Sequence, residues 1–333
     1  MTLLDVQDLS VMFTQRGRED VRAVDGVSFD VSAGEVVGLV GESGCGKSVT
    51  SLALMGLLPE KGVKVSGRAD FDGTNLLGVD QRTMRDLRGR ELGMIFQDPL
   101  SSLNPVVAIG KQVTEVLARH RGLSGDAAAK EAEHLLDRVG IPDPRRRLKE
   151  YPHQLSGGMR QRALIAMAVA CRPRLLIADE PTTALDVTIQ AQILELLKEL
   201  VHQDGTALIM ITHDLGVVAG LCDRINVLYA GRVVESAARR PLFAEPTHPY
   251  TRGLLGSIPR LDSVRGEPLN PIPGSVRDLL PWVEGCAFAP RCERVIEACV
   301  EAPPALIGGS HQYRCVNPVL GRSAGPEHLL EQE

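Results

Sequence analysis

Runs of apolar residues predict a series of β-strands within the first 240 residues of the chain. Residues 3–12 and 27–31 alternate apolar and polar positions, which is typical of strands with one buried face. Continuous apolar runs occur within 36–40, 174–180 and 207–214, as expected of strands that are buried on both faces of a parallel sheet. The last two runs end in polar residues, which would then lie at the ends of their strands.

Helical patterns separate these runs. Residues 48–58 follow a cluster of glycines and resemble a helix, residues 111–140 are rich in helix-forming types, and residues 189–201 place apolar side chains on one helical stripe. Two dipeptides that end in glycine, Asp72-Gly73 and Ala230-Gly231, predict hairpin turns. The alternation of strands and helices predicts an α/β fold with a parallel sheet and with ligand-binding groups at the strand ends.

Composition narrows the class of protein. Hydrophobic residues make up 44% of the 333 residues and charged residues 24%, whereas aromatic residues make up only 3%, so the core must be aliphatic. A formal net charge of -5 argues against a protein whose main task is to bind nucleic acid. No uncharged apolar run approaches the roughly 18 residues of a membrane span. The N-terminus lacks a basic-then-apolar signal, so we expect a cytosolic address with reduced thiols.

A candidate phosphate site follows the strand at 36–40. The stretch GESGCGKS, Gly41–Ser48, fits the pattern G-x-x-x-x-G-K-[ST] and lies between an apolar strand and a helix, as that pattern requires. Its glycines let backbone N–H groups surround an anion at the positive end of the helix. Lys47 would reach the terminal phosphates of a nucleotide and Ser48 would bind Mg²⁺, whereas Cys45 would contribute only its backbone.

Two carboxylates end the apolar run at 174–180. Asp179 follows four apolar residues, so it should lie at a strand tip and hold Mg²⁺. Glu180 comes next and is the natural general base for a water that attacks the γ-phosphate. A solvated acidic turn is the alternative, and the phosphate loop upstream favours the catalytic interpretation.

The stretch QLSGGMRQR, residues 154–162, resembles the signature motif of ABC-transporter ATPases. Other motifs fall in the order of that family: Gln97 in MIFQDP resembles the Q-loop, TALD at 183–186 the D-loop, and His213 in MITHD the switch histidine. Phe13 occupies the position of an aromatic residue that stacks on adenine in the family. The resemblance covers roughly residues 3–240.

This resemblance implies a fold and a division of the chain. Residues 1–240 would form a P-loop NTPase ABC cassette, with a RecA-like parallel sheet core, an antiparallel β subdomain and an α-helical subdomain at about 98–160. Residues 241–333, in which proline increases and apolar periodicity fades, would form a small cysteine-rich C-terminal extension.

The resemblance also implies which residues act on ATP. Catalysis would fall to Glu180, His213 and Gln97, and Mg²⁺ would be held by Ser48, Gln97 and Asp179. The ATP-binding residues of one subunit would be Phe13, Gly41, Glu42, Ser43, Gly44, Cys45, Gly46, Lys47, Ser48 and Val49. A second subunit, paired head to tail, would add its Ser156, Gly157, Gly158 and Asp186. Ser156 could also be an ordinary helix N-cap, and His213 an ordinary structural histidine.

Four stretches resemble the ATPases of dipeptide and oligopeptide importers, at 96–106, 151–162, 185–194 and 245–259. ATPases of nickel importers are similar and remain the alternative. The expected partners are a second, paralogous ABC ATPase, two membrane permeases and, indirectly, an extracytoplasmic peptide-binding protein. The chain would then be a peripheral protein at the cytoplasmic face of the cell membrane, without a nucleic acid partner.

Four cysteines, Cys286, Cys292, Cys299 and Cys315, lie within the last 50 residues. In a reducing compartment, four thiolates suit Zn²⁺ or an iron–sulfur cluster, and the spacing alone does not decide between them. The resemblance to peptide-importer ATPases with this pattern implies a [4Fe–4S] cluster, with Zn²⁺ or metal-free thiols as alternatives. His248 and His311 are possible further ligands. The group would act as a structural staple or as a redox or iron sensor.

Two rival functions fit parts of the sequence. A soluble ABC ATPase that acts on nucleic acid or ribosomes usually carries two cassettes or long coiled-coil insertions, whereas this chain has one set of motifs and no long heptad run. An iron–sulfur redox protein that merely inherited the cassette would not need Lys47, Asp179, Glu180 and His213 intact. The transport ATPase therefore explains the most residues.

Overall fold

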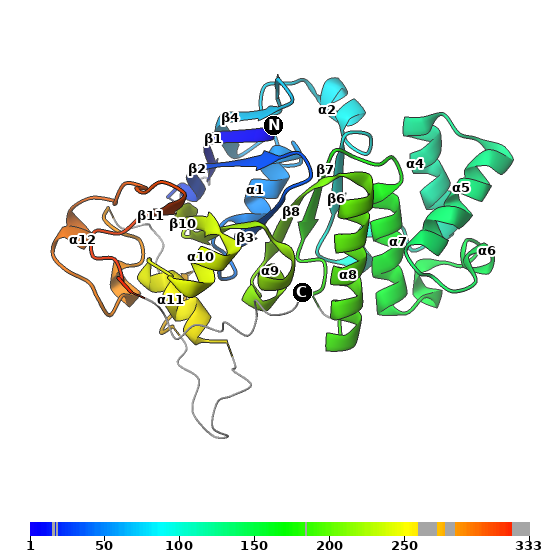
Figure 1. The fold of residues 1–333 in the computed structure, drawn as a ribbon. Helices are drawn as coiled ribbons and strands as arrows, with labels where there is room; N and C mark the ends of the chain where they lie inside the picture. The colour runs from blue at the N-terminus through cyan, green and yellow to red at the C-terminus, as the bar shows by residue number, and fades with distance from the viewer. Residues whose placement is uncertain (15–16, 18, 184, 259–271, 277–283, 322–333) are drawn as a thin grey trace. The chain divides into compact units, whose positions relative to one another are not determined.

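The computed structural model describes residues 1–14, 17, 19–183, 185–258, 272–276 and 284–321 (Figure 1). By its contacts the chain divides into two compact units. The first comprises Met1, 32–35 and 79–209, and the second comprises 2–31, 36–78 and 210–333. Ala184 of the predicted D-loop and Pro259 of the last importer-like stretch lie outside the described residues.

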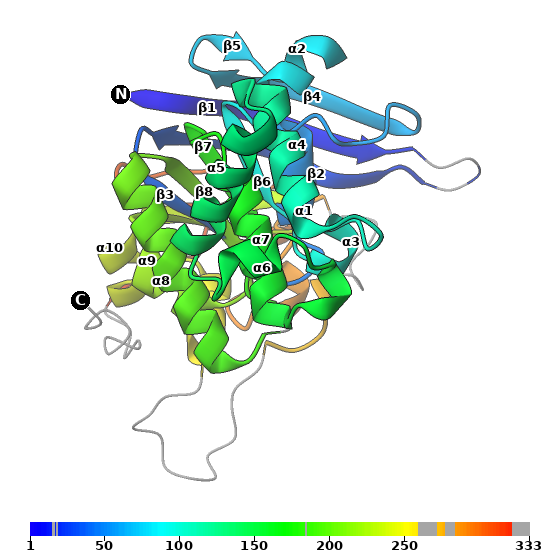
Figure 2. The ribbon, with the colours of Figure 1, turned by 90° about the vertical axis from the view of Figure 1, so that its right-hand side faces the viewer.

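The first unit is mainly helical. Its elements are α2 (Gln81–Leu87), β6 (Leu92–Ile95), α3 (Pro99–Ser102), α4 (Ile109–Arg121), α5 (Gly125–Arg138), α6 (Pro144–Arg147), η1 (Pro152–Gln154), α7 (Gly157–Val169), β7 (Leu175–Asp179), α8 (Val187–Asp204) and the start of β8 (Ala207–Thr212). Strands β6 and β7 pair in parallel; the apolar run within 174–180 predicts β7, whereas no strand is predicted at the position of β6. Helices α4, α5 and α7 contact one another and lie side by side in Figure 2.

The residues predicted as one helical stretch at 111–140 form two helices, α4 and α5. On α4, Ile109, Val113 and Leu117 recur every four residues and are buried. Gly122 then ends the helix in the left-handed conformation, with φ of 66°, and its N–H bonds to Leu117 O. Composition alone does not mark this stop because a single glycine in a helix-forming stretch is tolerated at modest cost.

The apolar stripe predicted within 189–201 is confirmed on α8. Four of its five members, together with Val201, are buried: Ile193, Leu196, Leu197 and Leu200. The fifth, Ile189, lies in the first turn of the helix and is only half-buried.

The second unit contains an antiparallel sheet and a further group of strands that pair both in parallel and antiparallel. The antiparallel sheet has the order β2-β1-β4-β5, with β1 (Thr2–Phe13), β2 (Val21–Ser32), β4 (Val63–Phe71) and β5 (Thr74–Asn75). Its other elements are β3 (Val36–Val40), α1 (Lys47–Leu54), α9 (Leu215–Leu221), β9 (Arg224–Tyr229), β10 (Arg232–Ala238), α10 (Arg239–Ala244), α11 (Pro249–Gly256), η3 (Ala289–Arg291), α12 (Ala298–Glu301) and β11 (His311–Tyr313). Strand β3 pairs in parallel with β9, whereas β10 pairs antiparallel with β9 and β11.

Both predicted hairpin turns are confirmed in the second unit. Asp72 and Gly73 join β4 to β5 with φ of 48° and 83°, and Ala230 and Gly231 join β9 to β10 with φ of 50° and 77°. Two successive positive φ angles match the twist of the flanking strands, which is why such turns connect hairpins. None of the helices in the described ranges is both long and apolar enough to cross a membrane.

Candidate nucleotide-binding and hydrolysis site

The phosphate loop (Gly41–Ser48) lies in the second unit, between the fully buried strand β3 and helix α1. Close packing explains two of its glycines. A Cβ added to Gly41 would collide with the carbonyl oxygen of Leu228, and one added to Gly46 would collide with that of Ala23. Gly46 also has φ of 100°, which side chains disfavour. The sequence therefore fixes a loop whose backbone is available for an anion at the start of α1.

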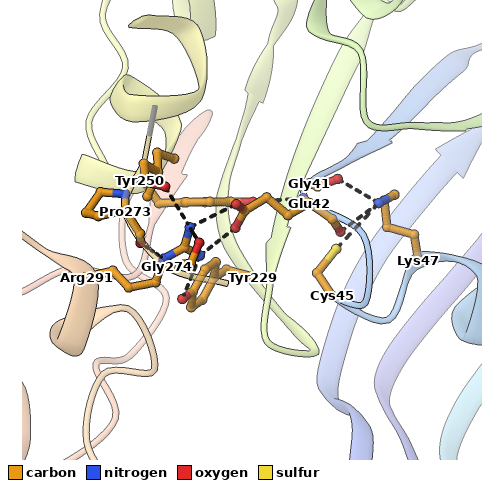
Figure 3. Close-up of polar contacts among 10 residues, drawn as sticks. Gly41, Glu42, Cys45, Lys47, Tyr229, Tyr250, Pro273, Gly274 and Arg291 are labelled. Carbon is orange, nitrogen blue, oxygen red and sulfur yellow. Dashed lines mark hydrogen bonds and ion pairs between the residues drawn. The ribbon is translucent and has the colours of Figure 1, made fainter. Parts of the chain in front are cut away.

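Lys47 is buried and held by the loop itself, with 4% of the residue exposed. Its Nζ donates to Gly41 O at 2.7 Å and to Glu42 O at 3.0 Å, and lies 3.7 Å from Cys45 Sγ (Figure 3). Burial raises the pKa of Cys45, so this thiol is protonated and inert at neutral pH. The ammonium group thus lies directly beside the backbone that would surround a phosphate.

The remaining predicted ATP-binding residues of the second unit differ in exposure. Ser43 and Gly44, in the middle of the phosphate loop, are exposed, whereas Ser48 and Val49, in the first turn of α1, are half-buried. Phe13 is half-buried at the end of β1, opposite Val63 of β4.

His213 follows directly after β8 in the second unit and is exposed. Its position at the end of a buried strand agrees with the pattern expected from the sequence. The next residue, Asp214, caps α9 by accepting a hydrogen bond from Gly216 N at 2.7 Å.

The first unit brings two predicted catalytic residues together. Asp179 is the last residue of β7 and is 5% exposed, and Glu180 follows it. The side-chain amide of Gln97, 83 positions earlier in the sequence, donates to Glu180 Oε2 at 2.9 Å. Thr183 Oγ1 donates to the same oxygen at 2.9 Å. Glu180 also has φ of 46°, and such backbone conformations in non-glycine residues are frequent at functional sites.

Thr183 has no assigned role in the sequence prediction. The available signal is a hydroxyl three positions after the carboxylate, in a turn closed by a hydrogen bond from Thr183 N to Glu180 O at 3.2 Å. A threonine three positions after a carboxylate is a weak signal, so the sequence alone does not identify this contact.

The stretch Ser156–Gly158 starts helix α7 in the first unit. Ser156 is the N-cap, and its Oγ accepts a hydrogen bond from Met159 N at 3.3 Å. This matches the ordinary capping role that the sequence left open. Ser156 and Gly157 are nevertheless exposed. Asp186 caps α8 in the same way, accepting from Ile189 N at 3.0 Å, and is also exposed.

The four C-terminal cysteines line one small cavity of the second unit, together with His248 and Phe288. No group of three or more His, Cys, Asp or Glu side chains within the described ranges is placed so that it could hold a metal ion. The predicted iron–sulfur or zinc site is therefore not found as a formed metal site. What the structure shows is the convergence of Cys286, Cys292, Cys299 and Cys315 on one cavity.

Two opposing effects act on the pKa of the cysteines that line this cavity. Burial raises the pKa of Cys286 and Cys292 and raises that of Cys315 to about 11, and the neighbouring cysteines contribute to the same direction. Opposing this, backbone N–H groups bond to the sulfurs, from Phe288 to Cys286, from Arg294 to Cys292 and from Asn317 to Cys315. Hydrogen bonds of this kind stabilise metal-bound thiolates. Without a cation these buried cysteines are neutral thiols at pH 7; as thiolates they would need a bound cation to offset the burial.

The two candidate histidines behave differently. His248 is buried beside the cavity, its Nδ1 accepts from Tyr250 N at 3.1 Å, and its Nε2 has no hydrogen-bond partner among the described residues. Burial lowers the pKa of His248 to about 4, so the ring is neutral at pH 7. His311 instead contacts Glu235 Oε1 through Nε2 at 2.7 Å and does not line the cavity.

A phosphate loop between a parallel strand and a helix, and a carboxylate held by a glutamine at the tip of another strand, define a P-loop nucleotide-binding protein. Residues 24–183 match the ABC transporter family, and residues 234–299 match the C-terminal region of oligopeptide/dipeptide transporters. The chain is 52% identical over 319 residues to the oligopeptide transport ATP-binding protein OppD of Salmonella typhimurium, covering 95% of this chain and 94% of that protein.

Two further comparisons also match this chain to ABC ATP-binding proteins. The dipeptide transport ATP-binding protein DppD of Bacillus subtilis is 52% identical over 316 residues, covering 94% of each chain. A solved dimeric ATP-binding cassette in a post-hydrolysis state, bound to ADP and Pi, is 29% identical with a TM-score of 0.64, over 71% of this chain and 99% of that one. This chain belongs to the ABC ATPases, in the family of the oligopeptide and dipeptide transport ATP-binding proteins. The cassette fold predicted from the sequence is confirmed.

Proposed function

We propose that this chain is the ATP-hydrolysing subunit of an importer for oligopeptides or dipeptides. The observation that carries the proposal is 52% identity, over 95% of the chain, to a protein named for oligopeptide transport. The likeness includes residues 234–299, beyond the phosphate loop that ABC cassettes share, so it extends to the part that is typical of peptide transporters. The chain would work as a peripheral protein at the cytoplasmic face of the membrane, beside two permease subunits.

The reaction is hydrolysis of ATP to ADP and phosphate. Water attacks the γ-phosphorus, the bond to the β,γ-bridging oxygen breaks, and the proton of the attacking water passes to the Glu180 carboxylate. The contacts from Gln97 and Thr183 to Glu180 Oε2 support this role because they orient the carboxylate.

The other residues bind rather than transfer protons. Lys47 and the backbone of the phosphate loop hold the phosphates, Phe13 stacks on adenine, and His213 contacts the γ-phosphate. Mg²⁺, held by Ser48, Gln97 and Asp179, would neutralise charge on the phosphates.

A test of the hydrolytic role is Glu180→Gln, which removes the base and keeps the shape. We expect ATP binding to persist while turnover falls roughly 10²- to 10⁴-fold, as is usual when a general base is lost. Glu199→Gln, on the exposed side of α8, is the matched control and should keep full turnover. Rapid hydrolysis by Glu180→Gln would remove Glu180 from this role.

The transported solute is tested in vesicles that contain the permeases and the binding protein, with ATP on the side of this chain. We expect ATP-dependent uptake of a labelled tripeptide or dipeptide, and none with Glu180→Gln. Uptake of Ni²⁺ without uptake of peptide would favour the alternative, a nickel importer.

We further propose a head-to-tail pair with a paralogous ABC subunit, in which each ATP contacts Ser156, Gly157, Gly158 and Asp186 of the other subunit. The exposure of Ser156, Gly157 and Asp186 at two helix starts supports this, because backbone N–H groups there are accessible to a partner's nucleotide. Sedimentation of Glu180→Gln with ATP, alone and with the paralogue, would separate a homodimer from a heterodimer.

For the cysteine cavity we propose a [4Fe–4S] cluster, with Zn²⁺ as the alternative. In a four-iron cluster each thiolate binds a different iron, so the four sulfurs surround the cluster and need not converge on one ion. The N–H groups directed at three of the sulfurs also favour bound thiolates. Anaerobic purification should give visible absorption with iron and acid-labile sulfide in equal amounts, lost in Cys292→Ser. Stoichiometric zinc without sulfide would support the alternative.

A further inference from the structure

A buried arginine beside the cysteine cavity is paired with an acidic residue of the phosphate loop. Arg291 ends the short helix η3, next to Cys292, and 4% of its side chain is exposed. Its Nη1 donates to Glu42 Oε2 at 2.6 Å and its Nη2 donates to Glu42 Oε1 at 2.9 Å (Figure 3). The pair joins residues that are 249 positions apart in the sequence.

The guanidinium of Arg291 is fixed by further contacts. Its Nε donates to Pro273 O at 2.6 Å, its Nη2 to Gly274 O at 3.1 Å, and its Nη1 to the Tyr229 hydroxyl at 3.3 Å. Arginine presents its donors in a rigid planar fork, which lysine does not. Because the fork is held by several acceptors, the Glu42 carboxylate that it binds is held in one position.

Glu42 is the point where three parts of the second unit meet. Its carboxylate binds Arg291, its N–H donates to the Tyr250 hydroxyl at 2.9 Å, and its C=O accepts from Lys47 Nζ at 3.0 Å. A shift of Glu42 would therefore move the peptide that holds the Lys47 ammonium. Since a phosphate loop binds through prearranged N–H groups and its lysine, holding Glu42 prepares the loop for nucleotide.

Attachment of the C-terminal residues does not require this pair. Buried Glu235 on β10 accepts hydrogen bonds from Thr247 N at 2.7 Å and His248 N at 2.9 Å, and its carboxylate contacts His311. Arg314 N donates to Val234 O at 2.8 Å, beside the pairing of β10 with β11. These contacts end on β10, whereas the contact of Arg291 ends inside the phosphate loop.

We propose that Arg291 is a positioning residue for nucleotide binding: by fixing Glu42 it holds the phosphate loop in the geometry that receives ATP. The inference rests on the proposed function, because it requires ATP to bind at Gly41–Ser48. It adds a residue near the end of the chain to a site whose motifs all precede residue 240.

The test measures ATP affinity by titration calorimetry in Mg²⁺, on the full chain purified anaerobically. Coupling between sites usually corresponds to about 5- to 150-fold in affinity, and we expect Arg291→Gln to bind ATP about tenfold more weakly. Glu42→Gln should show a similar loss, and the double variant should be no weaker than either single variant. Arg294→Gln is the matched control, since this nearby arginine contacts Asn317 and Pro318 O instead, and should bind as the wild type does.

A structural role would give a different result. If Arg291 only stabilises the fold, Arg291→Gln lowers the unfolding temperature while ATP affinity stays unchanged, and the proposal is wrong. If Arg291→Gln does not fold, Glu42→Gln decides, because it leaves the other contacts of Arg291 in place. Wild-type affinity in Glu42→Gln would overturn the proposal. Arg291→Lys keeps the charge without the fork and should recover only part of the lost affinity.

Kinetics gives a second readout. A positioning role in binding raises the KM for ATP in Arg291→Gln and leaves kcat within about twofold, because the Glu180 site is unchanged. A loss of kcat with unchanged KM would contradict it. Lys47→Ala separates the two hypotheses: if the wild type binds ATP no better than Lys47→Ala, the proposed function fails, and this inference fails with it.

Discussion

Two glycine-rich helix starts, the phosphate loop before α1 and Ser156–Gly158 at the start of α7, are built in opposite ways. In the phosphate loop, Gly46 has a positive φ, and Lys47 is buried against two carbonyls of the loop. At α7, Ser156 and Gly157 are exposed, and a Cβ added to Gly157 would meet Leu185 Cδ2 at 3.7 Å, an ordinary contact distance.

If both helix starts bind ATP as proposed, this difference suits them to separate tasks. The phosphate loop is held by contacts within its own unit, which suits the proposed binding of nucleotide by a single subunit. At the start of α7, Ser156 and Gly157 are exposed and Ser156 caps the helix, whereas Gly158 packs against Ile189; the two exposed positions suit the proposed contact with another subunit. The following variants test this contrast, in order of decreasing effect.

Lys47→Ala should have the largest effect. It removes a buried ammonium whose charged hydrogen bonds to phosphate we expect to be worth about 3 kcal/mol, or roughly 100-fold in ATP affinity. Calorimetric titration with ATP measures the loss. Lys198→Ala, on the exposed side of α8, is the control and should bind normally. Equal ATP affinities for Lys47→Ala and Lys198→Ala would contradict the role of Lys47 in binding phosphate.

Gly46→Ala should come next. Its Cβ would collide with Ala23 O at a φ of 100°, and we expect a loss of about 2 kcal/mol in the free energy of unfolding, measured by urea denaturation. Gly122→Ala is a control for backbone strain alone, because φ is 66° and no described atom lies within 4 Å of the added Cβ. It should cost about 1 kcal/mol.

Gly157→Ala should leave the isolated subunit unchanged, with the free energy of unfolding within about 0.5 kcal/mol of the wild type. The added methyl lies on an exposed helix start, where it would hinder a partner's nucleotide. We expect ATP-dependent subunit association to weaken about tenfold in the Glu180→Gln background, measured by sedimentation. A change in the ATP affinity of the single subunit would instead place Gly157 in that subunit's own site.

Ser156→Ala should have the smallest effect. Loss of the N-cap hydrogen bond to Met159 N should cost about 1 kcal/mol of stability. Thermal unfolding measures this loss, and Ser156→Asp, which preserves the cap, should restore it. Loss of association in Ser156→Asp, despite restored stability, is expected if Ser156 contacts the other subunit's ATP as proposed; unchanged association would limit Ser156 to capping.

Much of the fold could be predicted from the sequence because its signals are local. Buried strands such as β3 and β7 appear as apolar runs, the hairpin at Ala230-Gly231 is marked by its turn residues, and the phosphate loop has a fixed spacing next to a strand. Resemblance to a family placed Gln97 and Glu180 in one catalytic set, but their hydrogen bond was not predicted, since nothing local relates residues 83 positions apart.

The contacts of the C-terminal region could not be predicted in the same way. Arg291 and Glu42 carry no periodic or motif signal for their pairing, because the pair depends on how distant backbone segments pack. The aromatic cluster has the same origin: Tyr229 lies 4.6 Å from Tyr250 and 5.2 Å from Phe288 between ring centroids. Four cysteines predicted a metal site; they line one cavity, but the described residues form no metal site, and sequence spacing does not fix the distances between sulfurs.

Glu42 is held by Arg291, Tyr250 and Lys47, and two of these residues lie beyond residue 240. This limits how the cassette can be separated from its C-terminal region. A chain shortened at residue 240 would retain each nucleotide motif yet lose Tyr250 and Arg291 together. The Glu42 carboxylate would then be left without its cation, and a partly buried charge that loses its partner is costly. We therefore expect that residues 1–240 cannot simply be joined to an unrelated C-terminal region. The new region would have to supply an arginine side chain that binds Glu42 as Arg291 does.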